Sequence, residues 1–211
     1  MKHFTIILLL FIYQSIAGQT YPTKMIIAKA DSILKITVGD SVYKYYHYDK
    51  LSCYEYNNSK NKPNLKYLTK NKNTKGHFRY ADVRFYFSHP ILKGICILTS
   101  VKLDSNLNLM DSICLEQIPD FIKQGKPCDF ISSEKALGIA KDSIKYKGIE
   151  QVKEYFDYNS KHKRYVYIVY NVLSRQPDSQ GLDSGEEETI IIDAITGKIL
   201  EHWKGWYGTI D

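Results

Sequence analysis

The sequence predicts an α+β fold made of two units, each a helix packed on an antiparallel β-sheet. Two segments, at residues 23–35 and 132–147, repeat apolar residues with helical periodicity. Each is followed by aromatic and β-branched runs of strand length. Each series of strands then ends in an apolar strand, an Asp, a short turn and another apolar stretch. A chain of 211 residues is long enough for one large domain or two small ones.

In the first unit, one helical face of residues 23–35 collects Ile26, Ile27, Ala30, Ile33 and Leu34, and Thr23 is the expected N-cap. Strands are expected at residues 41–56, 79–87 and 94–103. In the second unit Ser132 is the expected N-cap of a helix running to residue 147, where Gly148 would end it. Its buried stripe is Ala136, Leu137, Ala140 and Ile144.

The strands of the second unit are expected at residues 153–158 and 164–174. Alternation places Val166, Ile168 and Tyr170 on one face and Tyr165, Tyr167 and Val169 on the other. A helix should cover one face and leave tyrosines partly in water. After a polar loop at residues 176–188, a β-hairpin closes the unit. The Asp193 carboxylate should accept hydrogen bonds from backbone N–H groups of the hairpin turn, and Gly197 should adopt a left-handed conformation.

The helix, the aromatic strand and the run Ile191-Ile192-Asp193-Ala194-Ile195-Thr196-Gly197-Lys198-Ile199-Leu200 together resemble the PepSY domain family, named for propeptides of secreted peptidases. The resemblance is clearest over residues 131–206. A degenerate copy spans residues 23–115, where Asp104 follows a strand as Asp193 does, but Ser105-Asn106 replaces Thr-Gly; chance similarity is the alternative. The resemblance implies binding or restraint of peptidases and brings no catalytic residues.

The N-terminus predicts export. A basic head, Met1-Lys2-His3, precedes an apolar stretch at residues 4–13, and small residues surround Ala17. The stretch is shorter than the roughly 20 residues needed to span a bilayer, which disfavours the alternative of a membrane anchor. We therefore expect a signal peptide at residues 1–18, an N-terminal unit at 19–118, a C-terminal unit at 119–211, a secreted or periplasmic location, and no stable membrane insertion after cleavage.

Export permits disulfides, and the 4 cysteines allow three pairings. If Leu103 faces Leu107 across the Asp104 turn, counting outward places Cys96 opposite Cys114, so a Cys96–Cys114 disulfide is predicted. Cys53 and Cys128 would then be a second pair or buried thiols.

Charged and catalytic motifs point to few specific sites. The net charge of +6 is concentrated in a lysine-rich stretch, residues 60–75, which indicates either an anion-binding surface or a solvated loop. Export favours the loop, and no nucleic-acid partner is expected. The acidic residues Asp178, Asp183, Glu186, Glu187 and Glu188 lack calcium-loop spacing. Without a metal motif, G-x-S-x-G or a P-loop, we expect no metal, no cofactor and no enzymatic activity.

Tyrosine is unusually frequent, with 18 Tyr against 8 Phe. Tyrosine supplies apolar contact area at low entropic cost and is common at interfaces, although half-buried strand surface is the alternative explanation. Tyr45, Tyr165 and Tyr167 are the candidate binding residues. We expect an exported, non-enzymatic protein-binding module whose partner is an exported protein, including a peptidase restrained in trans. The alternative is a periplasmic small-ligand or calcium-binding protein.

Overall fold

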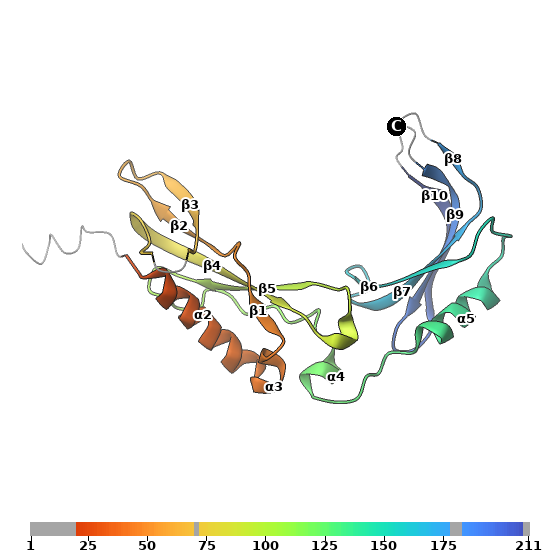
Figure 1. Cartoon of the computed structure of the whole chain (residues 1–211), viewed down its shortest axis with the longest axis horizontal. Helices are drawn as coiled ribbons and strands as arrows, with labels where there is room; N and C mark the ends of the chain where they lie inside the picture. The colour runs from red at the N-terminus through yellow and green to blue at the C-terminus, as the bar shows by residue number, and fades with distance from the viewer. Residues whose placement is uncertain (1–19, 70–71, 178–182, 209–211) are drawn as a thin grey trace, which may run out of the picture. The chain divides into compact units, whose positions relative to one another are not determined.

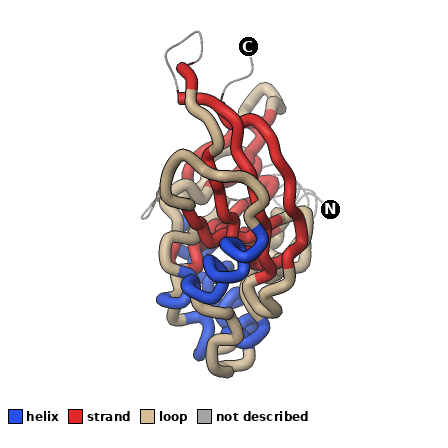
Figure 2. The backbone as a smooth tube through the Cα atoms, turned by 90° about the vertical axis from the view of Figure 1, so that its right-hand side faces the viewer, coloured by secondary structure: helices blue, strands red, loops and turns tan. Residues whose placement is uncertain are grey.

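The computed structural model describes residues 20–69, 72–177 and 183–208. It confirms the α+β class: the described residues form four α-helices and two antiparallel sheets (Figures 1 and 2). The chain divides into two compact units, Met1–Gly125 and Lys126–Asp211. The division falls after Gly125 rather than after residue 118, because the short helix α4 (Asp120–Lys123), with Phe121 and Ile122 buried, belongs to the first unit.

The sheet of the first unit is built around the long strand β4 (His77–Phe87). The strand β5 (Ile97–Leu103) pairs with one edge of β4, and β1 (Tyr46–Tyr48) and β2 (Cys53–Asn57) follow one another along the other edge. The strand β3 (Pro63–Tyr67) pairs with β2 at the rim of the sheet. Two further helices, α2 (Thr23–Val38) and α3 (Asp40–Tyr43), precede the sheet, and a 3-10 turn spans Pro90–Leu92.

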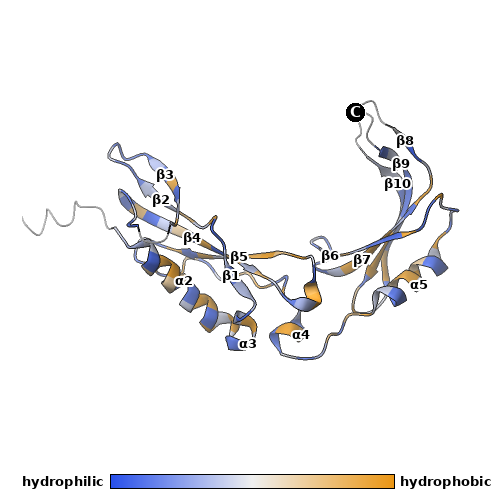
Figure 3. Cartoon of the chain, viewed as in Figure 1, coloured by the Kyte–Doolittle hydropathy of each residue, from blue (hydrophilic) through white to orange (hydrophobic). Residues whose placement is uncertain are grey.

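The core of this unit lies between α2 and the sheet. The helix α2 contains both apolar and polar residues (Figure 3). Its fully buried residues Ile26, Ala30 and Leu34 lie in a stripe on one helical face. The alternate residues of β4 meet this stripe with Ala81, Val83, Phe85 and Phe87. Thr23 is the first residue of α2 rather than its N-cap, which is Pro22.

The predicted strand at residues 41–56 is wrong, because a turn interrupts it. Asp49 is buried there: its N–H donates to Arg84 O at 2.8 Å, and its carboxylate accepts from Leu51 N at 2.9 Å. This turn separates β1 from β2. The lysine-rich stretch is also not entirely a loop, because residues 63–67 form the edge strand β3.

The second unit is a four-stranded antiparallel meander covered by one helix, α5 (Ser133–Ser143). Its strands β6 (Lys153–Asn159), β7 (Arg164–Val172), β9 (Asp183–Asp193) and β10 (Ile199–Tyr207) pair in that order, and β8 (Gln176–Pro177) adds a short pairing to β9. Ser132 caps the helix by accepting a hydrogen bond from Lys135 N at 3.2 Å. Ala136 and Ala140 are fully buried, and α5 contacts β7 and β9.

The hairpin between β9 and β10 has the predicted turn. Asp193 Oδ1 accepts hydrogen bonds from Ile195 N at 2.9 Å and Thr196 N at 2.7 Å. Gly197 is left-handed, with φ of 72°, and its N–H donates to Asp193 O. Burial tends to raise the pKa of Asp193, but these amides and the Arg164 guanidinium, 2.8 Å away, lower it below its ordinary value.

The first unit contains a shorter version of this turn. Asp104 Oδ1 accepts from Asn106 N and Asn108 N, each at 2.8 Å, and Leu107 adopts the left-handed conformation with φ of 62°. Leu103 therefore lies opposite Leu109, not Leu107. In this register Cys114 does not lie opposite Cys96, and all four cysteines are free thiols. The predicted Cys96–Cys114 disulfide is wrong.

Candidate functional site

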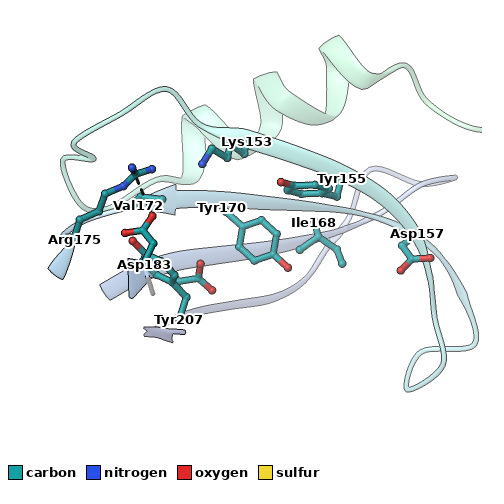
Figure 4. A pocket seen from close by; sticks show the side chains of 10 residues that line it. Lys153, Tyr155, Asp157, Ile168, Tyr170, Val172, Arg175, Asp183 and Tyr207 are labelled. Carbon is teal, nitrogen blue, oxygen red and sulfur yellow. Dashed lines mark ion pairs between the residues drawn. The ribbon is translucent and has the colours of Figure 1, made fainter. Parts of the chain in front are cut away.

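The sheet of the second unit has one face covered by α5 and an opposite face that carries an open groove of about 500 Å3 (Figure 4). Pairing determines which side chains share that face: Tyr155 lies opposite Ile168, and Lys153 lies opposite Tyr170. The groove is lined by Lys153, Tyr155, Asp157, Ile168, Tyr170, Val172, Arg175, Asp183, Glu187 and Tyr207.

Aromatic and aliphatic side chains form the floor of the groove. The rings of Tyr155 and Tyr170 meet edge to face with centroids 5.6 Å apart, and Tyr155 is 55% exposed. Burial raises the pKa of Tyr170, and the nearby acids Glu187 and Asp157 raise it further, so its phenol is neutral at physiological pH. The floor therefore offers uncharged aromatic surface to a ligand.

Charges are distributed unevenly along the groove. Near one end, Arg175 binds Glu150 at 2.7 Å and Asp183 at 3.6 Å, and Lys153 binds Glu150 at 3.1 Å. Asp157 and Glu187 form no ion pair with any residue that the structure describes; the Asp157 carboxylate accepts from Tyr158 N, and Glu187 accepts from the Thr189 hydroxyl. The cations are thus already neutralised, whereas two carboxylates are available to a ligand.

A close backbone approach shapes the end of the groove near Arg175. A Cβ atom on Gly185 would lie 2.1 Å from Ser174 O and 3.1 Å from the ring of Tyr207. Only glycine permits β9 to lie so close to the segment that follows β7. The Tyr207 hydroxyl donates to the same Ser174 O at 3.4 Å, which places the tyrosine at the rim.

Tyr165 and Tyr167 do not belong to this face, and the expectation that they are exposed is wrong. They are 6% and 7% exposed and lie on the side covered by α5. Tyr165 stacks on Phe156 with centroids 5.3 Å apart, and the Tyr167 hydroxyl donates to Ile131 O at 2.7 Å. Burial raises the pKa of both phenols. These tyrosines are core residues that fill the space beside the small alanines of α5.

Tyr45 lies in the other unit and is half-buried. Its ring meets the imidazole of His89 edge to face at 4.3 Å and the ring of Phe87 at 6.0 Å. It lines a shallow cavity of about 630 Å3 beside Leu92 and Cys96. The three tyrosines predicted from the sequence therefore do not form one site.

A buried polar cluster on the helix side of the second sheet was missed in the sequence. Glu188 is 0% exposed, and its carboxylate accepts from Lys145 N at 2.9 Å, Asn171 Nδ2 at 2.9 Å and Tyr146 N at 3.4 Å, with His202 Nε2 at 2.8 Å. It binds the two amides just beyond α5, so the helix ends at Ser143 instead of residue 147. Gly148 does not end the helix; its missing side chain makes room for Asn171.

The acidic run is dispersed by strand alternation. Glu188 points into the core, Glu187 lies in the groove, and Glu186 pairs with Lys204 at 3.0 Å. Within the described residues, no three His, Cys, Asp or Glu side chains are grouped as metal ligands would be. Asp178 and the predicted signal peptide, residues 1–18, lie outside the described residues. None of the described helices is both long and apolar enough to span a bilayer.

Comparisons of the chain with protein-family models, with curated proteins and with solved structures give no match.

Proposed function

We propose that this chain is an exported, non-enzymatic protein-binding module whose C-terminal unit binds an extended segment of its partner in the groove. The observation that carries the proposal is the sheet face opposite α5, where Tyr155 and Tyr170 remain accessible above an apolar floor. A volume of about 500 Å3 is within the range of binding pockets. Because the groove is open, a polypeptide can pass through it with alternate side chains pointing at the floor.

The chemistry of the lining selects the partner. Ammonium and guanidinium groups bind to tyrosine faces and form charge-assisted hydrogen bonds with free carboxylates. Asp157 and Glu187 provide such carboxylates on either side of Tyr170, while Arg175 is already bound to acids. The preferred segment should therefore alternate apolar or aromatic residues with Lys or Arg. The resemblance to PepSY domains extends the proposal to a secreted peptidase, held in trans, as the protein that presents this segment.

A small molecule is the second candidate ligand, because the same volume suits one. The two kinds of ligand differ in the contacts that provide their affinity. A peptide contacts residues along the whole groove, whereas a small molecule contacts residues at one end of the groove only. A calcium site in the acidic run has less support, because the side chains of Glu186, Glu187 and Glu188 have different partners.

The test is titration of the purified chain with synthetic extended peptides of alternating Leu and Lys, followed by backbone amide NMR. We expect saturable shifts on β6 and β7, and at least a tenfold loss of affinity in the variant carrying Tyr155→Ala and Tyr170→Ala. Peptides with Glu in place of Lys should not bind. Tyr146→Ala is the matched control, because Tyr146 is 45% exposed but lies beside Lys204, outside the groove.

Equal affinity of the double variant and the control would remove the groove from consideration. Hydrolysis of peptide or ester substrates by the purified chain would contradict the non-enzymatic part of the proposal.

A further inference from the structure

The lysine-rich stretch of the first unit contains a cavity that the proposed function does not use. Lys66, Lys72 and Lys75 line it together with the aromatic residues Tyr54 and Tyr67, and its volume is about 360 Å3. Its residues come from the start of α2, from β2 and β3, and from the segment before β4. The cavity therefore brings three cations, distributed over ten positions of the sequence, to one place.

These three lysines have no acidic partner among the described residues. Ion pairs are formed by other lysines, among them Lys35, Lys102, Lys123, Lys153, Lys161 and Lys204. The ammonium group of Lys75, followed by that of Lys72, lowers the pKa of Lys66. Like charges held together without a counter-charge repel one another, and a bound anion would remove that repulsion.

The backbone that carries the lysines is anchored on both sides of the cavity. Lys66 lies on β3 directly opposite the buried Tyr54 of β2, and the Tyr54 hydroxyl accepts from Lys75 N at 3.1 Å. Lys72 O accepts from the backbone and the hydroxyl of Thr23, each at 2.8 Å. The lysine Cα atoms are thus held by contacts to the sheet and the helix, which reduces the ordering needed when a ligand binds.

We propose that Lys66, Lys72 and Lys75 form a binding site for one phosphate or sulfate group. Each ammonium group presents three donors, and a tetrahedral dianion has enough acceptor oxygens and charge to bind all three. A carboxylate supplies a single charge and two oxygens, so it satisfies the cluster less completely. The single cluster of three lysines provides the donors for one such group, whereas nucleic acid would need a basic stripe along several phosphates.

Titration calorimetry of the chain with inorganic phosphate and with sulfate, at constant ionic strength set by chloride, tests the site. We expect saturable binding of one anion per chain, weakened at least tenfold by Lys66→Gln and by Lys75→Gln. Lys29→Gln, an exposed lysine of α2 with the same charge change, should leave the affinity unchanged. Circular dichroism verifies that the variants are folded.

Two ligand sources are distinguished by a second titration with vesicles containing phosphatidic acid, whose headgroup is a phosphate monoester. Binding of vesicles without binding of the free anions would assign the site to a lipid headgroup, and the reverse to a soluble phosphate or sulfate. Non-saturable heats with every ligand, or equal losses in Lys29→Gln and Lys66→Gln, would overturn the proposal. The variant with Tyr155→Ala and Tyr170→Ala should bind phosphate normally, so this site can be tested whether or not the groove binds peptides.

Discussion

Replacing Glu188 with glutamine tests whether a buried carboxylate fixes the end of α5 against the sheet. The side chain is fully buried and accepts hydrogen bonds from two backbone amides and from Asn171 and His202. Glutamine has the same shape, but it replaces one acceptor oxygen with an NH2 donor. That donor must face N–H groups that already point at it, so at least one buried donor loses its partner.

The expected loss of unfolding free energy is about 2–3 kcal/mol. A hydrogen bond to a charged group contributes about 1.5–3 kcal/mol, and breaking a buried charged network by removing one partner costs about 3–5 kcal/mol. Glutamine keeps one acceptor oxygen, so the expected loss lies below the roughly 3–5 kcal/mol that follows from removing a partner completely. In a domain of this size, such a loss lowers the melting temperature by roughly 10–20 °C.

The pH dependence supplies an independent test. Burial alone raises the pKa of Glu188, but the hydrogen bonds from Lys145 N, Asn171 and His202 lower it below its ordinary value. A carboxyl group with a lowered folded-state pKa stabilises the fold above the unfolded value, about 4.3, and that stabilisation disappears as the pH falls through the folded value. The difference in unfolding free energy between the wild type and Glu188→Gln should therefore be largest near neutral pH and should decrease in acid.

Urea denaturation followed by circular dichroism, at pH values from 7 down to 3, measures both effects. Glu187→Gln is the matched control: the neighbouring carboxylate lies in the groove on the opposite face, and its loss should change stability by no more than about 0.5 kcal/mol. The reasoning is refuted if Glu188→Gln and Glu187→Gln unfold at the same urea concentration at pH 7. If the difference in unfolding free energy stays constant from pH 7 to 3, the ionised form of Glu188 is not the source of the stabilisation.

Three further predictions concern single positions. Asp193→Ala should lower the unfolding free energy by about 1–2 kcal/mol in a thermal melt, because two turn amides and Arg164 lose their acceptor; an unchanged melting temperature would contradict the role of the turn. Gly185→Ala should lower the unfolding free energy measured by urea denaturation by about 3 kcal/mol, because the added Cβ would overlap Ser174 O. An unchanged unfolding free energy would show that β9 can move away from Ser174. A thiol reagent should label the exposed Cys96, Cys114 and Cys128 quickly in the native state and Cys53 slowly, because Cys53 is buried and burial raises its pKa. Peptide mapping that finds a Cys96–Cys114 disulfide would contradict the observed register.

The features that could be predicted from the sequence are those whose causes are local. The Asp193 turn depends on an Asp and a Gly four positions apart, and the hydrogen bonds that Ile195 N, Thr196 N and Gly197 N donate to Asp193 join residues within the turn. The stripes of α2 and α5 follow from helical periodicity alone, and Ser132 has the chemistry of a cap. In each case the interaction that fixes the structure joins residues that are also close in the chain.

The features that were missed depend on distant residues or on unusual backbone conformations. The end of α5 is set by Glu188, 43 positions from Lys145, which helix periodicity cannot reveal. The Asp104 turn uses a left-handed Leu107, a conformation that leucine rarely adopts, so the register of the chain after β5 could not be counted from the sequence. The edge strand β3 lies inside the lysine-rich stretch at residues 60–75 and begins with Pro63, and this composition alone suggests a loop.

The orientation of the second sheet explains why Tyr165 and Tyr167 were expected on the exposed face. In β7 the two faces are equally apolar and aromatic, so this strand does not identify the inner one. The neighbouring strand β6 does: Lys153, Tyr155 and Asp157 alternate with Glu154, Phe156 and Tyr158, and the first set carries two charges while the second carries the phenylalanine. Phenylalanine has no hydroxyl that needs a partner, so in a chain that uses tyrosine so freely it marks the covered face. Because Phe156 lies opposite Tyr167, and Tyr155 lies opposite Ile168, the strand pairing then assigns Tyr167 to the core, and Tyr155 and Tyr170 to the face that carries the groove.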